Sequence, residues 1–235
     1  MKNHTLKEII TTRFTLIVSL PENDARTALA VQKAGADAIK VHLNCHHRAS
    51  GTHFGTWEQE KSKISELPGL LDIPVGIVPG AEEVASLGEM AELAALGFDF
   101  LDIFAHHIPC PFFGLGEFSK VVATDYTFPL DHIPSLEAAG TDIIEASVIH
   151  PEGYGKPLSG KDLALYGALV KKASRPVFIP TQRKISPQDI PYLHRAGAGG
   201  IAIGAVVTGK ERERIAEVTA EFRTAIDRML LRSNN

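Results

Sequence analysis

The stretch "ALAVQKAGADAIKVHLN", residues 28–44, contains a helix end, a glycine stop and a strand in succession. Its first part ends at Gly35, and a glycine just past a helix supplies the left-handed backbone conformation that terminates the helix. Its second part, 37–43, is strand-like, and apolar residues there alternate with Lys40 and His42. Because side chains alternate across a strand, one face suits packing against helices while the other carries polar groups.

The same succession recurs along the chain. Eight segments are strand-like, namely 14–20, 37–43, 74–80, 98–104, 120–126, 142–148, 176–181 and 200–205. Alternating strands and helices predict a parallel sheet, and a count of eight favours its closure into a barrel. The turn after the first strand, 19–27, lacks the glycines of a nucleotide-binding open sheet. We therefore predict an α/β protein with one domain over residues 1–235, a single (βα)8 TIM barrel.

The composition is that of an ordinary globular protein. The 235 residues are 44% hydrophobic and 22% charged, with a net charge of −4, and no basic patch indicates a nucleic-acid partner. Cys45 and Cys110 match no metal or redox spacing. We find neither a secretory leader nor an apolar run long enough to span a membrane. We expect a cytoplasmic protein with a small-molecule partner, and a homo-oligomer stays open.

Polar residues gather where several strands end. On the predicted inner faces these residues are Ser19, Lys40, His42, Asn44, Asp102, His106, Glu145 and Ser147. Barrel active sites are built at the carboxyl ends of the strands. Burying charges is costly even when they are paired, so this group favours a polar ligand over a purely structural ion pair of Lys40 with Glu145. We expect the other histidines of these loops, His46, His47, His53 and His107, to be solvated.

The last two units predict a phosphate site. In many barrels the loops after strands 7 and 8 hold a phosphate through backbone N–H groups. Gly204 and Ala205 follow strand 8, and Arg183 follows strand 7, where a guanidinium can grip a phosphate through two hydrogen bonds. The long loop 44–60, which carries Arg48, is expected to cover the site. The glycine-containing segment 150–163 is a candidate lid.

Two stretches together resemble one known family. They are "VVATDYTFPLDHIPSLEAAGTDIIEASVIHPEGYG" (121–155) and "RPVFIPTQRKISPQDIPYLHRAGAGGIAIGAVVTG" (175–209), and they are similar to the second half of N-acetylmannosamine-6-phosphate 2-epimerases. The resemblance implies a phosphate-binding barrel. The catalytic lysine of that family lies on strand 3, where this chain has "VGIVPGAE" (75–82), and its catalytic glutamate corresponds to Thr181. The resemblance therefore argues against the same chemistry at the same positions.

Three functions are consistent with these residues. The first is a sugar-phosphate isomerase or epimerase, with Glu145 as base, Lys40 as acid or electrostatic stabiliser, and His42, Asp102 and His106 polarising hydroxyl groups. The second is a lyase of the aldolase or decarboxylase type, with Lys40 as Schiff-base or electrostatic residue. The third is a non-catalytic barrel that binds a phosphosugar.

The binding residues predicted for all three functions share a position at the strand ends or in the loops that follow them. They are Ser19, Asn44, Arg48, Ser147, Arg183, Gly204 and Ala205. No cofactor is required. A divalent metal held by His42, Asp102, His106 and Glu145 is an alternative, because metal-dependent epimerases draw such ligands from different strands.

Overall fold

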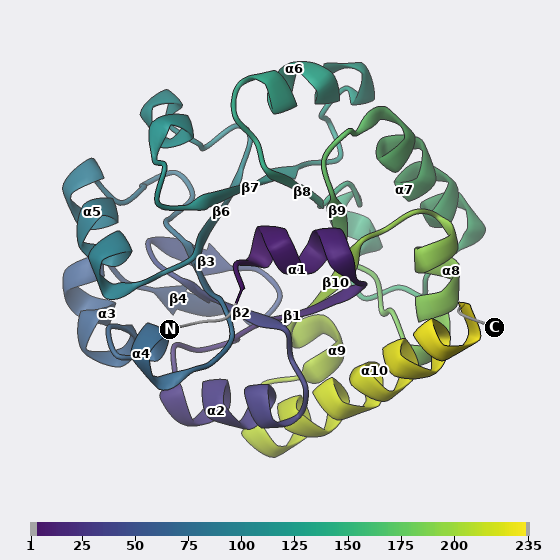
Figure 1. The fold of residues 1–235 in the computed structure, drawn as a ribbon, viewed down its shortest axis with the longest axis horizontal. Helices are drawn as coiled ribbons and strands as arrows, with labels where there is room; N and C mark the ends of the chain where they lie inside the picture. The colour runs from purple at the N-terminus through teal and green to yellow at the C-terminus, as the bar shows by residue number, and fades with distance from the viewer. Residues whose placement is uncertain (1–3, 234–235) are drawn as a thin grey trace.

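A computed structural model describes residues 4–233 and shows a closed barrel of eight parallel strands. The strands follow one another around the barrel in the order β1-β10-β9-β8-β7-β6-β5-β2 (Figure 1). Their bounds are β1 (Thr15–Ser19), β2 (Ala38–His42), β5 (Val75–Val78), β6 (Phe100–Phe104), β7 (Ser119–Thr124), β8 (Ile143–Ala146), β9 (Val177–Pro180) and β10 (Gly200–Ile203). The predicted (βα)8 fold is confirmed, and each strand lies within one or two residues of its expected place.

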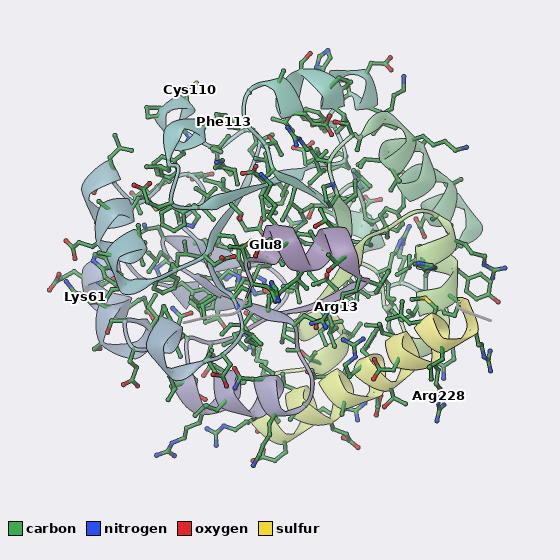
Figure 2. The ribbon with its side chains drawn as sticks, in the orientation of Figure 1. Glu8, Arg13, Lys61, Cys110, Phe113 and Arg228 are labelled. Atoms are coloured by element: carbon green, nitrogen blue, oxygen red, sulfur yellow. The ribbon has the colours of Figure 1, made fainter. Side chains whose placement is uncertain are left out.

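Helices surround the barrel as an outer ring (Figure 1). They are α2 (Ala25–Lys33), α3 (Trp57–Ile64), α4 (Leu67–Leu70), α5 (Leu87–Leu96), α6 (Ile133–Ala138), α7 (Gly160–Lys172), α8 (Ile190–Arg195), α9 (Ala205–Thr208) and α10 (Arg212–Ser233). Four 3-10 turns complete the connections, at Cys110–Gly114, Leu130–His132, Pro151–Gly153 and Pro187–Asp189. Side chains fill the space between strands and helices, whereas Lys61 and Arg228 point outward at the rim (Figure 2). None of the helices within residues 4–233 combines the length and the hydropathy that crossing a bilayer requires.

An N-terminal helix, α1 (Leu6–Thr12), lies across the middle of the ring at the amino ends of the strands (Figure 1). A capping box between Thr5 and Glu8 starts it. Leu6 and Ile10 pack into the barrel against inward-facing strand residues, which are Ile17, Ala38, Phe100, Val121, Ile143, Phe178 and Ala202. This cluster confirms the predicted inner faces, and α1 seals the floor of the barrel with apolar side chains.

The loop between β2 and α3 contains an element that the sequence did not predict. Its hairpin pairs β3 (Cys45–His47) with β4 (Thr52–Phe54) in antiparallel register. Asn44 directly precedes the hairpin and has a φ of 48°. Its side-chain amide donates to the Pro79 carbonyl oxygen at 3.1 Å. The hairpin thus leaves the end of β2 in an orientation set by the neighbouring end of β5.

Gly76 allows β5 to pack beside the Phe100 ring. A Cβ atom at residue 76 would lie 2.1 Å from that ring, inside the filled barrel. We expect Gly76→Ala to lower the free energy of unfolding by about 1–3 kcal/mol, because an overpacked core must shift. Urea denaturation measures this, with Gly69→Ala in α4 as control. A Cβ at residue 69 meets no atom within 4 Å, so the control is expected to keep or slightly raise stability.

Candidate functional site

A cavity of about 480 Å³ opens at the carboxyl ends of the barrel strands. Its lining includes many of the residues predicted from the sequence, namely Ser19, Lys40, His42, Arg48, Asp102, His106, Glu145, Ser147 and Gly204. Cavities of this size hold small organic ligands. The opposite end of the barrel is filled by α1 and apolar side chains, so the cavity is closed below and opens only at the carboxyl ends of the strands.

Lys40 lies at the centre of this cavity floor between two carboxyl groups. Its Nζ is 2.6 Å from Asp102 Oδ2 and 2.5 Å from Glu145 Oε2. All three side chains are less than a tenth exposed. Glu145 has a further partner in Ser147, whose Oγ donates to Glu145 Oε1 at 2.7 Å. We call Lys40, Asp102 and Glu145 the lysine triad.

The barrel geometry explains why these residues meet. Lys40, Asp102 and Glu145 each lie two residues beyond an inward-facing apolar residue, on β2, β6 and β8. In an eight-stranded barrel, alternate strands contribute to one layer of side chains. The fourth strand of this set is β10, whose corresponding residue is Gly204. Because glycine contributes no side chain, the layer is open on that side, and the cavity extends there.

The triad holds one proton donor and one proton acceptor in contact. Burial works to lower the pKa of Lys40, but the charges of Asp102 and Glu145 outweigh it and raise that pKa. Burial and the charge of Glu145 raise the pKa of Asp102 well above its usual value. Burial opposes ionisation of Glu145 too, yet Lys40 and the hydrogen bonds lower its pKa. Lys40 is therefore held as an ammonium, and of the two carboxyl groups Asp102 binds a proton more readily than Glu145.

Two imidazoles lie beside the triad, the buried His42 and the half-buried His47. His42 Nε2 is 3.3 Å from Ser19 Oγ, and the His42 ring stacks on Phe54 of the hairpin at 4.7 Å. Burial lowers the pKa of His42 well below its usual value, and burial together with Lys40 lowers that of His47 to about 4. Both rings are therefore neutral. The expectation that His47 is solvated is wrong, because the hairpin folds it over the cavity; His53 is exposed, as expected.

His106 lies at the rim of the cavity and not with the triad. Its side chain is 50% exposed, and its Nδ1 is 3.1 Å from Asp125 Oδ2. Within residues 4–233 no three His, Cys, Asp or Glu side chains are arranged to hold a metal ion. The four candidate ligands of the metal alternative, His42, Asp102, His106 and Glu145, are therefore not brought together, because His106 lies beyond the end of β6 at the rim.

Arg183 is not in the cavity, which corrects its predicted contact with phosphate. Its Nη2 lies 2.8 Å from Asp162 Oδ1, and its Nη1 donates to the Gly153 carbonyl oxygen at 2.9 Å. The guanidinium therefore joins the segment 150–163 to the loop after β9. A further bond from the Lys184 amide to the Lys156 carbonyl oxygen ties the same two segments.

Two other predicted binding residues also lie outside the cavity lining. Asn44 is turned toward Pro79, as described above, and Ala205 is absent from the lining although its neighbours Gly204 and Val206 belong to it. In both cases the backbone turns at the strand end and carries the residue out of the inward-facing series.

The lining also includes Tyr154, Thr181 and Gln182, which the sequence analysis did not predict as binding residues. Thr181 Oγ1 accepts a hydrogen bond from the Gly204 amide at 2.9 Å, which joins the ends of β9 and β10. Thr181 and Gln182 directly follow β9, so their place at a strand end was a usable signal. Tyr154 carried no such signal, because it lies well beyond the end of β8.

The hairpin covers the mouth of the cavity. Arg48, at its turn, places its guanidinium carbon 5.6 Å from the centre of the Tyr154 ring. Tyr154 follows β8, which lies on the opposite side of the barrel from β2 in the strand order. Arg48 forms no ion pair with any residue in 4–233, so its charge is available to a ligand.

Comparisons with known proteins show the fold and no family. No family model matches the sequence, and no curated protein matches it. A tryptophan synthase structure from Mycobacterium tuberculosis matches with a TM-score of 0.76 at 15% identity, over 95% of this chain and 99% of that chain. Thiamine phosphate pyrophosphorylase from Pyrococcus furiosus matches with a TM-score of 0.65 at 15% identity, over 96% and 99%. KGPDC from Streptococcus mutans matches with a TM-score of 0.66 at 15% identity, over 93% of this chain and 100% of that chain. The chain thus shares the TIM-barrel fold of known enzymes, and the predicted likeness to the epimerases is not shown.

Removing the ammonium should leave two buried carboxyl groups without a counter-charge. We expect Lys40→Met to lower the free energy of unfolding at neutral pH by about 3–5 kcal/mol. Without Lys40 both carboxyl groups have pKa values above those of the unfolded chain, so the folded state binds more protons. The variant should then regain stability more steeply than the wild type as the pH falls from about 7 to about 5.

Chemical denaturation at several pH values measures both effects. Lys172→Met is the matched control, because Lys172 forms an exposed ion pair with Asp131. The control is expected to cost less than about 1 kcal/mol, with no change in the pH dependence. Equal costs for the two variants would show that the triad is not a strongly coupled buried group.

Proposed function

We propose that this protein is an enzyme that moves a proton at a carbon next to the carbonyl group of a phosphorylated carbohydrate. The observation that carries this proposal is the lysine triad at the floor of the cavity. It places two carboxyl groups within hydrogen-bond distance of one ammonium, and their pKa values are shifted in opposite directions. Perturbed acid–base groups of this kind concentrate at functional sites.

Each triad residue then has a role that follows from its charge. Glu145 takes the proton from the carbon, the C–H electron pair forms a carbon–carbon double bond, and the carbonyl π electrons move to the oxygen. The ammonium of Lys40 stabilises the negative charge that develops on that oxygen. Asp102, whose pKa is raised, is the proposed acid, and in its protonated form it supplies a proton to the carbon that lost one or to the neighbouring carbon, so an isomer or epimer forms without net gain or loss of protons.

The side-chain layer of the lysine triad is open at Gly204, and we assign the phosphate group of the substrate to this space. Gly204 and Val206 line the cavity where α9 begins. The Gly204 amide donates to Thr181, so what this side of the cavity offers is space. Arg48 supplies a positive charge from above the cavity and replaces Arg183 as the proposed phosphate contact. The fold is shared with thiamine phosphate pyrophosphorylase, whose name includes a phosphate compound.

The lyase alternative differs in what Lys40 must do. A Schiff base forms from a neutral amine, and the two carboxyl groups keep Lys40 in its charged form. The geometry therefore favours an electrostatic role for Lys40 over a covalent one. A decarboxylation that passes through an enediolate would use the same electrostatic role, so this branch of the lyase alternative remains a second candidate.

Exchange of carbon-bound hydrogen with solvent tests the proposed function before the product is known. We expect ketose and aldose phosphates, screened in D₂O by proton NMR, to include one whose hydrogen next to the carbonyl exchanges when the protein is added. Glu145→Gln should slow this exchange at least about 100-fold, because it removes the base. Glu92→Gln, on the surface, is the control and should leave it unchanged.

Absence of exchange with every phosphorylated carbohydrate of the panel would contradict the proposal. Sodium borohydride distinguishes the covalent lyase, because reduction fixes only an imine. A borohydride-trapped adduct on Lys40 would therefore replace the electrostatic role with a Schiff base.

Arg48 and Arg183 should respond differently to truncation. We expect Arg48→Ala to weaken binding of the phosphorylated ligand roughly tenfold, because it removes a charge that faces the cavity. Arg183→Ala should instead lower the free energy of unfolding by about 1.5–3 kcal/mol and leave ligand affinity nearly unchanged. Calorimetric titration and urea denaturation measure the two effects. Loss of binding in Arg183→Ala alone would restore the contact predicted from the sequence.

A further inference from the structure

Tyr154 brings a hydroxyl group to the same cavity from the segment that follows β8. The side chain is partly buried, and burial together with the charge of Glu145 raises the pKa of its phenol. The charges of Lys40 and Arg48 also act on it, in the opposite direction. The phenol is therefore within electrostatic range of the lysine triad, and it stays protonated at neutral pH.

The hydrogen bonds of Gln182 determine what this hydroxyl can do. Gln182 Oε1 accepts from the Ile149 amide at 3.0 Å, which fixes the orientation of the side-chain amide. Its Nε2 lies 3.0 Å from the Ser147 carbonyl oxygen and 2.9 Å from Tyr154 Oη. An amide nitrogen has two hydrogens and accepts no hydrogen bond. One hydrogen goes to Ser147, so the other goes to the phenol oxygen.

The Tyr154 oxygen is thus an acceptor toward Gln182, and its own hydrogen is left for another partner. Within residues 4–233 no acceptor takes that hydrogen. The Gln182 side chain is only 5% exposed and is held by three hydrogen bonds, so it is rigid. Because the rigid Gln182 amide donates to the phenol oxygen from one side, the O–H bond of Tyr154 points away from Gln182.

We propose that the Tyr154 hydroxyl donates a hydrogen bond to the substrate oxygen that becomes negative during proton transfer, and that Gln182 is the positioning residue that leaves this hydrogen free. The inference rests on the proposed function and adds a second donor to Lys40. As Glu145 removes the proton, the C–H electron pair forms the carbon–carbon double bond of an enolate. The carbonyl π electrons move to oxygen, and the O–H of Tyr154 remains intact.

Donors that meet a developing oxyanion act on the transition state more than on the bound substrate. The test therefore compares two probes. Phosphoglycolohydroxamate carries a phosphate and imitates an enediolate, whereas glycerol 3-phosphate carries a phosphate and has no carbonyl group. We expect Tyr154→Phe to weaken binding of the hydroxamate roughly 10- to 100-fold, because it loses a hydrogen bond to a charged group. Its affinity for glycerol 3-phosphate should stay within about twofold of the wild type, because the ring that Arg48 contacts is kept.

Gln182→Glu tests the positioning role. A carboxylate has no hydrogen to donate and instead accepts the Tyr154 proton. We expect this variant to lose affinity for the hydroxamate about as much as Tyr154→Phe, although the tyrosine is present. Tyr192→Phe, on the outer helix α8, is the control and should leave both affinities unchanged. Thermal melts confirm that each variant is folded.

The outcomes separate this inference from the proposed function. Equal affinities of wild type and Tyr154→Phe for the hydroxamate would overturn the role of Tyr154 while the proposed function stands. Equal losses for both probes would assign Tyr154 to general binding and overturn its transition-state role. If the wild type binds neither probe, the proposed function fails first, and the inference fails with it.

Discussion

The ammonium of Lys40 cannot be held inside the barrel without a counter-charge, and much of the site follows from this constraint. The free energy cost of burying one ion is several kcal/mol, and it is offset only by close and well-directed partners. Asp102 and Glu145 supply them from two other strands, at 2.6 and 2.5 Å. Around this one ammonium the pKa of Asp102 is raised and that of Glu145 is lowered, so the same charge balance sets a candidate acid beside a candidate base.

The surrounding structure shields the lysine triad from bulk water. Below the triad, α1 and the inward apolar residues seal the barrel floor. Above it, the β3–β4 hairpin extends from β2 to Tyr154 on the opposite side of the mouth. A low local dielectric strengthens each electrostatic contact within the cavity. The same enclosure holds His42 and His47 neutral, so neither adds a charge to those of the triad and Arg48.

Arg183 and Gln182 are adjacent in the sequence, but their side chains contact different parts of the structure. Arg183 has the chemistry of a phosphate contact, but Asp162 and the Gly153 carbonyl oxygen take its guanidinium. Gln182, one residue earlier, reaches the cavity and orients Tyr154. Neither outcome follows from residue type. Each depends on the direction in which the chain leaves β9, and on where the segment 150–163 returns to meet it.

The alternation of side chains along each strand was enough to predict the barrel and the inward position of Lys40, Asp102 and Glu145, because strand geometry has a fixed period of two. That period ends where the strand ends. The places of Asn44, His47, His106, Tyr154 and Arg183 were therefore decided only by the tertiary structure. Contacts between loops that are distant in sequence set those positions, and no local periodicity encodes them. The sequence by itself thus determined the fold and the floor of the site, while loop packing decided which groups cover it.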